Sequence, residues 1–377
     1  MTTDPTSDGE AATRKRLVIV AGVGRSGTSL FTTILGMAGF HVPQPEVKAD
    51  STNPKGFGES QWVVDFHGRQ LRSRRVSVWD SRPAAWEQTE SAAADPATVG
   101  ELRSWLAVQF VGRDSVVIKD PRVGWFLPLW RKAAEDIGVD VSFAALLRHP
   151  AEAVSSALKW YGDWQTPASR SLSWVNIMLE TEHATRGDRR VFVRYEDLLT
   201  NWSDEVHRIG VALDIPVLID LPDGVRKEIE AFVDPTLHRQ RVTFSDVGVP
   251  DRVEEIAEDV WKHFTGLAVA GGDSGENQAA IDAARGRYHA FYAEAEAIAQ
   301  STIHALRPKG GAAGTRGATG GRTTGSASGR GAGGSGADAL IRVVERVVPP
   351  KLRRRVPPVW RSRIMRTANR AARLVRR

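Results

Sequence analysis

The chain of 377 residues contains no cysteine. This absence excludes disulfide bonds, thiolate zinc sites and cysteine nucleophiles. The sequence also lacks an H-E-x-x-H pattern, and we expect no metal at its functional site. No stretch reaches the roughly 18 consecutive apolar residues that a membrane-spanning helix needs. The polar N-terminus has no apolar segment of the kind that a signal peptide carries. We therefore expect a cytoplasmic protein.

Acidic residues are scarce only toward the C-terminus, which accounts for the net charge of +6. Residues 337–377 hold 13 Lys and Arg against two Asp and Glu, and residues 306–336 hold five cations and no acid. Residues 1–305 therefore carry a net charge near −10. Because the basic character belongs to the tail and not to the body, we do not expect nucleic acid as a partner.

Large apolar residues are nearly absent from residues 306–336, which are rich in Gly, Ala, Thr and Ser. This composition predicts a disordered linker. We divide the chain into a disordered N-terminus (1–15), a folded domain (16–305), the linker (306–336) and a basic helical tail (337–377). The tail interleaves arginines with apolar residues, including Trp360. This pattern favours peripheral contact with an anionic lipid surface on the inner face of the membrane, and a solubilising tail is the alternative.

Short apolar runs alternate with helical patterns along residues 17–194. Four of these runs predict strands, at Leu17–Ala21, Ser115–Lys119, Val141–Leu147 and Arg190–Arg194. Apolar spacings of three and four predict helices over Leu30–Ala38, Gln61–Leu71, Val99–Val111, Trp125–Ile137 and Ala151–Trp160. The alternation predicts a P-loop-like α/β fold of three layers, with a central parallel sheet flanked by helices. Ligands of such sheets bind beyond the carboxyl ends of the strands.

The first predicted strand runs into the glycine-rich segment GVGRSGTS, from Gly22 to Ser29. Its glycines permit a tight turn, and its hydroxyls and free N–H groups at a helix start attract an anion, so the segment predicts a phosphate site. Two known patterns fit incompletely. The triphosphatase P-loop requires a lysine where Thr28 stands, and a dinucleotide site requires an acidic residue on the second strand, which we do not find.

Each predicted strand ends at a cation. Arg25 follows the first strand and Lys119 ends the second, while Arg148 and Arg194 come at the ends of the third and fourth. The carboxyl ends of parallel strands lie at one edge of the sheet, so we expect these side chains to gather around an anionic ligand.

Four motifs, GVGRSGTS, KDPR, LLRHPAEAVSSALKW and VRYEDL, occur in the order and spacing that resemble the PAPS-dependent sulfotransferases. The segment from Asn53 to Glu59 matches the N-P-x-G-[FY]-x-E element of a bacterial branch of that family. The resemblance covers about residues 17–200 and does not reach the linker or tail. It implies transfer of a sulfuryl group from 3′-phosphoadenosine-5′-phosphosulfate (PAPS) to a hydroxyl. The sequence does not indicate whether the acceptor is a small molecule, a glycan or a lipid.

The resemblance also implies roles for particular residues. The 5′-phosphosulfate would lie on Gly24, Arg25, Ser26, Gly27, Thr28 and Ser29. Arg148 and Ser156 have the spacing of the pair that binds the 3′-phosphate, with Ser155 as the alternative hydroxyl. Tyr195 matches a tyrosine near the adenine, although packing in the core explains it equally well. Arg25 and Lys119 correspond to cations that stabilise charge during transfer.

The catalytic base is left open by the resemblance, because Pro121 stands where the cytosolic members carry histidine. Glu59 and Asp120 are the two carboxylates that we consider first, with Glu59 favoured. His67 and Glu46 are further candidates.

Other departures from the family pattern keep alternatives open. The R-K-G element of the cytosolic animal enzymes is absent, and His238-Arg239-Gln240-Arg241 is a candidate substitute. A P-loop-like nucleotide kinase and a non-catalytic, membrane-associated nucleotide-binding protein therefore remain as alternative functions.

Overall fold

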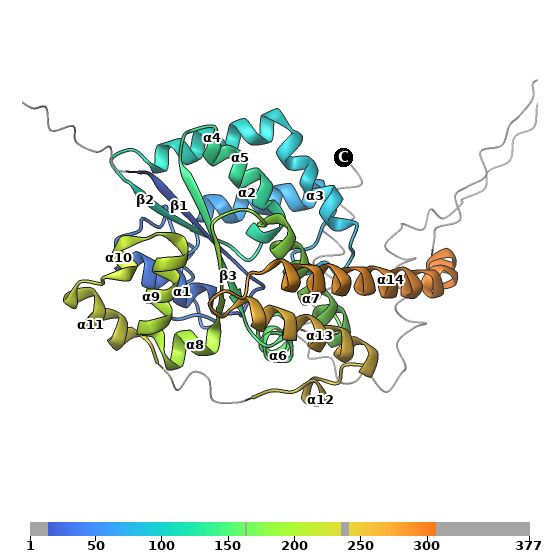
Figure 1. The fold of residues 1–377 in the computed structure, drawn as a ribbon. Helices are drawn as coiled ribbons and strands as arrows, with labels where there is room; N and C mark the ends of the chain where they lie inside the picture. The colour runs from blue at the N-terminus through green and yellow to red at the C-terminus, as the bar shows by residue number, and fades with distance from the viewer. Residues whose placement is uncertain (1–13, 163, 235–240, 307–377) are drawn as a thin grey trace, which may run out of the picture. The chain divides into compact units, whose positions relative to one another are not determined.

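Four parallel strands in the order β2-β1-β3-β4 form the sheet at the centre of the fold (Figure 1). In β1, Leu17 lies opposite Val116 on one side and Val141 on the other. The strand interiors are apolar except for Ser142 of β3, as expected where helices cover both faces of a sheet. All four predicted strands are confirmed within one residue at each end, as β1 (Arg16–Ala21), β2 (Ser115–Lys119), β3 (Asp140–Leu147) and β4 (Arg190–Arg194).

Alternate residues of β1 point to opposite faces of the sheet and enter two separate cores. Leu17 and Ile19 belong to the larger core, while Val18 and Val20 belong to the smaller one. All four side chains are buried. This arrangement of helices, sheet and helices confirms the predicted three-layer α/β fold.

The smaller core is covered by the helix that follows β1 and by four helices that follow β4. They are α1 (Thr28–Met37), α8 (Tyr195–Thr200), α9 (Trp202–Leu213), α10 (Pro216–Ile219) and α11 (Asp223–Phe232).

The larger core gathers the other helices. They are α2 (Gln61–Ser73), α3 (Ala85–Ala94), α4 (Pro96–Gln109), α5 (Leu127–Glu135), α6 (Pro150–Tyr161), α7 (Pro167–Ala184), α12 (Phe244–Val247), α13 (Asp251–Leu267) and α14 (Gly275–Leu306).

One predicted helix is divided. The pattern over Trp125–Ile137 resolves into a short 3₁₀ helix, η1 (Val123–Phe126), followed by α5 from Leu127. Pro128 lies in the first turn of α5, where its missing N–H leaves no helical hydrogen bond broken, and it therefore marks a helix start.

The computed structural model describes residues 14–162, 164–234 and 241–306 (Figure 1). Leu306, the first residue of the predicted linker, belongs to α14. The remainder of the predicted linker, the basic tail, and all but the last two residues of the predicted disordered N-terminus lie outside the described residues. Over the described ranges, no helix is both long enough and apolar enough to cross a membrane.

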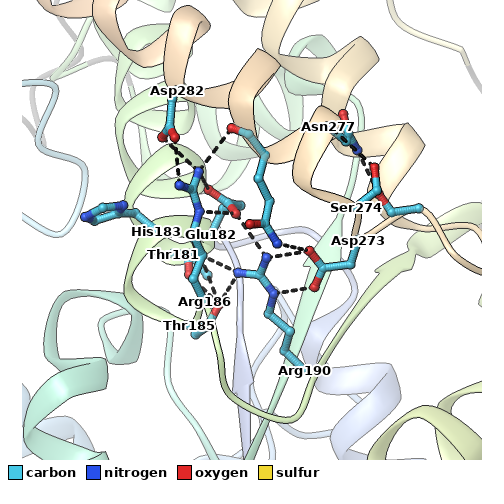
Figure 2. A network of polar contacts seen from close by, with 12 residues as sticks. Thr181, Glu182, His183, Thr185, Arg186, Arg190, Asp273, Ser274, Asn277 and Asp282 are labelled. Atoms are coloured by element: carbon cyan, nitrogen blue, oxygen red, sulfur yellow. Dashed lines mark hydrogen bonds and ion pairs between the residues drawn. The ribbon is translucent and has the colours of Figure 1, made fainter.

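A buried ionic network joins the end of α7 to the start of β4 and to α14 (Figure 2). Its centre is Glu182, which has no exposed surface. Arg186 donates to both Glu182 oxygens at 2.8 and 2.7 Å, and Arg190 adds a bond of 3.0 Å. The two arginines continue to Asp282 and Asp273, which belong to α14 and the segment before it. This network attaches α14 to the remainder of the fold.

We predict that Glu182→Gln lowers the free energy of unfolding by about 3 kcal/mol, because Arg186 and Arg190 each lose the buried one of their two carboxylate partners. Urea denaturation of the full chain measures the loss. Glu255→Gln is the matched control, since the Arg252–Glu255 pair has side chains 70% and 63% exposed. It should change the free energy by less than about 1 kcal/mol. Equal losses in the two variants would contradict a central role for Glu182.

Candidate active site

The glycine-rich segment forms a tight loop between β1 and α1. Gly22 and Gly27 have φ angles of 137° and 87°, in the region that favours glycine. A Cβ atom at Gly27 would approach the Tyr195 ring to 2.2 Å, so only glycine fits between the loop and α8. Arg25 adopts a φ of 75°, an unusual conformation for a residue with a side chain. Such strain is commonly retained where a ligand is bound.

The first turn of α1 leaves backbone N–H groups available next to this loop. The first helical bond runs from the Phe31 N–H to the Gly27 carbonyl at 3.2 Å. The N–H groups of Thr28, Ser29 and Leu30 therefore have no acceptor within the helix. All three residues line the same cavity, so this helix end can receive an anion.

A cavity of about 400 Å³ lies beyond the carboxyl ends of β1, β2 and β3. The structure brings ten of the predicted site residues to its wall: Gly24, Arg25, Gly27, Thr28, Ser29, Glu59, Lys119, Arg148, Ser156 and Tyr195. Ser156 lines the cavity and its neighbour Ser155 does not. Arg194, the cation at the end of β4, pairs with Asp197 at 2.7 Å and is not part of the wall.

Two predicted residues lie elsewhere. Ser26 is fully buried and its N–H bonds to the Val23 carbonyl at 3.2 Å, so it faces away from the cavity. Asp120 is also buried outside the wall, where His67 Nδ1 lies 2.7 Å from one carboxylate oxygen and Arg122 donates to the other at 2.7 Å. Burial acts to raise the pKa of Asp120, but His67 and Arg122 hold it below its ordinary value.

His67 is likewise engaged inside the core. Its Nε2 accepts a hydrogen bond of 2.9 Å from Trp130 Nε1, so Nδ1 carries the proton that is donated to Asp120. Glu46 is exposed and accepts from Gln44. Of the four base candidates, Glu59 alone lines the cavity.

Glu59 and Lys119 form a buried ion pair at the end of β2. Lys119 Nζ also donates to Ser29 Oγ and to the Phe57 carbonyl, both at 3.2 Å. Burial raises the pKa of Glu59 above its ordinary value, and the charge of Lys119 opposes this shift without cancelling it. The pair therefore places a cation and a carboxylate that readily accepts a proton beside the first turn of α1.

Two arginines lie on another wall of the cavity. Arg25 Nε donates to Ser156 Oγ at 3.0 Å, and Arg148 donates to the Arg25 carbonyl at 3.0 Å. The Arg148 guanidinium lies over the Tyr195 ring, 4.9 Å from its centroid, and Glu152 accepts from its Nε at 3.0 Å. Both arginines line the cavity, and their positive charge favours a bound anion.

The segment from Asp50 to Glu59 covers one side of the cavity. Asn53 Nδ2 donates to Ser29 Oγ at 3.3 Å, and Lys55 Nζ donates to the Phe232 carbonyl of α11 at 2.9 Å. Of the residues in this segment, Glu59 alone carries a role predicted from the sequence. The N-P-K-G-F run could have identified Asn53 and Lys55 as site residues. No local sequence pattern indicates that Phe232 and Tyr161 line the cavity.

Residues 235–240 lie outside the described residues, so most of the candidate segment from His238 to Arg241 does too. Arg241 is exposed and lies 3.5 Å from Glu196. Within the described ranges, no three His, Asp or Glu side chains gather in an arrangement that would hold a metal ion.

Comparison with known proteins identifies similarity to sulfotransferases. A family model described as "Sulfotransferase family" matches residues 18–220. The sulfotransferase domain of the Synechococcus PCC 7002 olefin synthase is 16% identical, with 73% of this chain and 96% of that domain covered and a TM-score of 0.36. Sulfotransferase STF1 from Mycobacterium tuberculosis H37Rv is 17% identical over 64% of this chain and 76% of that protein, also with a TM-score of 0.36. No curated protein matches the chain.

We predict a distinctive pH dependence for Glu59→Gln. Folded Glu59 keeps its proton to a higher pH than unfolded Glu59, so the wild type loses stability as pH rises above about 4.5. The variant lacks this loss. Its unfolding free energy relative to wild type should therefore increase with pH, as measured by urea denaturation between about pH 3 and pH 8.

Asp95→Asn is the control of opposite sign. A hydrogen bond from Thr98 lowers the pKa of Asp95, so the wild type gains stability as pH rises toward about 3.8, and the variant lacks that gain. The unfolding free energy of Asp95→Asn relative to wild type should therefore fall as pH rises. A flat or falling difference for Glu59→Gln would show that the pKa of Glu59 is not raised.

Proposed function

The chain belongs to the sulfotransferase family, and on this basis we propose that it transfers the sulfuryl group of PAPS to a hydroxyl of a small-molecule, glycan or lipid acceptor. The observation that carries the proposal is the single cavity that joins the anion-binding helix end, Lys119 and Arg148. PAPS carries anionic groups at both its 5′ and 3′ positions. A cavity with cations on two walls suits such a donor.

The 5′-phosphosulfate would lie against the loop and the first turn of α1. The N–H groups at this helix end and the hydroxyls of Thr28 and Ser29 would donate to the phosphate oxygens. Ser26 takes no direct part in this proposal, because it is buried away from the cavity. Arg25 would stabilise the charge that develops on the oxygen bridging phosphorus and sulfur.

The 3′-phosphate would bind to Arg148 and Ser156. The stacking of Arg148 on Tyr195 and its bond to Glu152 hold the guanidinium in one orientation, which supports recognition of a fixed anion. Ser156 Oγ already accepts from Arg25 Nε, so the 3′-phosphate site would lie next to the arginine of the loop. The Tyr195 ring would then lie near the adenine.

In the reaction, the acceptor oxygen would attack sulfur while the bond from sulfur to the bridging oxygen breaks. Glu59 would take the proton of the acceptor hydroxyl, and the bridging oxygen would leave with the negative charge on 3′-phosphoadenosine-5′-phosphate (PAP). The raised pKa of Glu59 makes it a better proton acceptor than an ordinary exposed carboxylate. Protonation of Glu59 would free Lys119 to interact with the sulfuryl oxygens. Asp120 would serve only to hold Arg122 and His67.

Binding of PAP to the full chain tests the donor assignment. We predict that Arg148→Ala weakens binding by about 10- to 100-fold, because a charge-assisted contact with the 3′-phosphate is lost. Isothermal titration calorimetry measures the dissociation constant. Arg113→Ala is the control, since Arg113 is an exposed cation just before β2 that does not line the cavity.

The control variant should bind PAP like the wild type. An equal loss in both variants would indicate a general charge effect in place of a site at Arg148. Tight binding of ATP with no response to PAP would overturn the proposed donor and favour a nucleotide kinase.

A further inference from the structure

Arg170 of α7 is a fully buried cation that the donor site does not use. Among the described residues, its only side-chain hydrogen bond runs from NH2 to the Gly162 carbonyl at 2.7 Å, and its Nε and NH1 atoms have no partner there. Across the described residues, no carboxylate forms an ion pair with it. A buried charge without a counter-ion is unfavourable, so the N–H groups of Arg170 are available to an external anion.

Two tryptophans enclose the guanidinium. The ring centroids of Trp79 and Trp164 lie 5.6 and 5.7 Å from Arg170 Cζ. Trp79 is buried, whereas Trp164 is 60% exposed, so Arg170 lies only one side chain below the surface. Burial lowers the pKa of Arg170, but a guanidinium stays protonated in proteins. Exposed side chains change rotamer within nanoseconds, and movement of Trp164 would open the site.

Two sets of contacts place Arg170 close to the cavity. A Cβ atom at Gly24 would lie 3.8 Å from both Trp79 and Pro121, so Trp79 packs against the loop that forms the cavity wall. Gly162, which accepts from Arg170, directly follows Tyr161 of the same wall. The Arg170 N–H groups, which would donate to an anion, therefore lie near the place where a sulfuryl acceptor would approach the donor.

The segment carrying Trp79 is held rigidly. Gln165 Nε2 donates to the Trp79 carbonyl at 2.7 Å, and Asn176 Nδ2 donates to the carbonyls of Asp80 and Arg82, both at 3.0 Å. Contacts from α7 and its preceding segment thus fix the position of Trp79 relative to Arg170. A fixed arginine and ring are the arrangement that a specific polar contact requires.

Three partly exposed aromatic residues at the end of α6 and just beyond it are named here the exposed aromatic row. They are Trp160, Tyr161 and Trp164, which are 38%, 41% and 60% exposed, and Lys159 Nζ lies 5.1 Å from the Trp160 ring centroid. Flat exposed rings complement the C–H faces of sugar rings, and rings open to solvent suit an extended chain better than a small enclosed molecule. The single lysine beside them does not form the basic cluster that anionic membranes attract.

We propose that the acceptor is an acidic saccharide whose carboxylate binds Arg170 between Trp79 and Trp164 and whose rings stack on the exposed aromatic row. This inference rests on the proposed sulfotransferase function. Arg170 acts here as a specificity and positioning residue and takes no part in the transfer itself.

The test compares two probes that differ only at C6, para-nitrophenyl β-glucuronide with a carboxylate there and para-nitrophenyl β-glucoside with a hydroxymethyl group. Calorimetry on the full chain saturated with PAP measures the affinity of each. We expect the glucuronide to bind about tenfold more tightly, because only it offers a carboxylate to Arg170. Arg170→Met should abolish this preference while leaving PAP affinity unchanged, which also verifies that the variant is folded.

Several results would overturn the inference. One is equal binding of both glycosides to the wild type, including no detectable binding of either. Another is a preference that survives in Arg170→Met.

Two further controls separate the alternatives. Binding to vesicles containing phosphatidylserine that requires Arg170, without a preference between the glycosides, would favour a lipid surface and overturn the saccharide. If PAP does not bind the wild type, the proposed function fails; if PAP binds and the glycosides do not differ, only the present inference fails.

Discussion

The buried ion pair between Lys119 and Glu59 is the interaction on which the remainder of the cavity depends. It joins the end of β2 to the segment that covers the cavity, and Lys119 also reaches Ser29 in the first turn of α1. Three elements that are distant in sequence are thereby held around one space. Because burial keeps the pKa of Glu59 raised even beside Lys119, the pair also supplies the proton acceptor that the proposed reaction needs.

The strand ends were predictable from the sequence because local patterns determine them. β-branched runs mark buried parallel strands, and the polar residues that follow must lie at one edge of the sheet. As these patterns predict, Arg25, Lys119 and Arg148 line one cavity. The sequence could not show that Asp120 turns into the core, because that depends on His67 reaching it from α2, which is distant in sequence. Phe232 of α11 reaches the cavity through tertiary packing alone, and no spacing in the sequence predicts such a contact.

The cavity and the buried Arg170 illustrate two ways in which this fold holds positive charge. Around the cavity, Lys119 and Arg148 have carboxylate partners, Glu59 and Glu152, so their charges are balanced before a ligand arrives. Within the part of the chain that the structure describes, Arg170 contacts only aromatic faces and one side-chain-bonded carbonyl. Trp79 connects the two regions, since it contacts Arg170 on one side and packs against the loop at Gly24 on the other. Donor and acceptor recognition would thus share one rigid segment.

Turnover with radiolabelled PAPS and a panel of hydroxyl acceptors tests the central claim most directly. The account predicts transfer by the wild type and a fall in kcat of about a hundredfold or more in Glu59→Gln, with PAP affinity retained. Asp65→Asn, which alters an exposed carboxylate of α2, should leave kcat unchanged. Transfer that is insensitive to Glu59→Gln but abolished in a folded Asp120→Asn variant would contradict the assignment of the base. No transfer from PAPS to any acceptor by the wild type would contradict the proposed reaction.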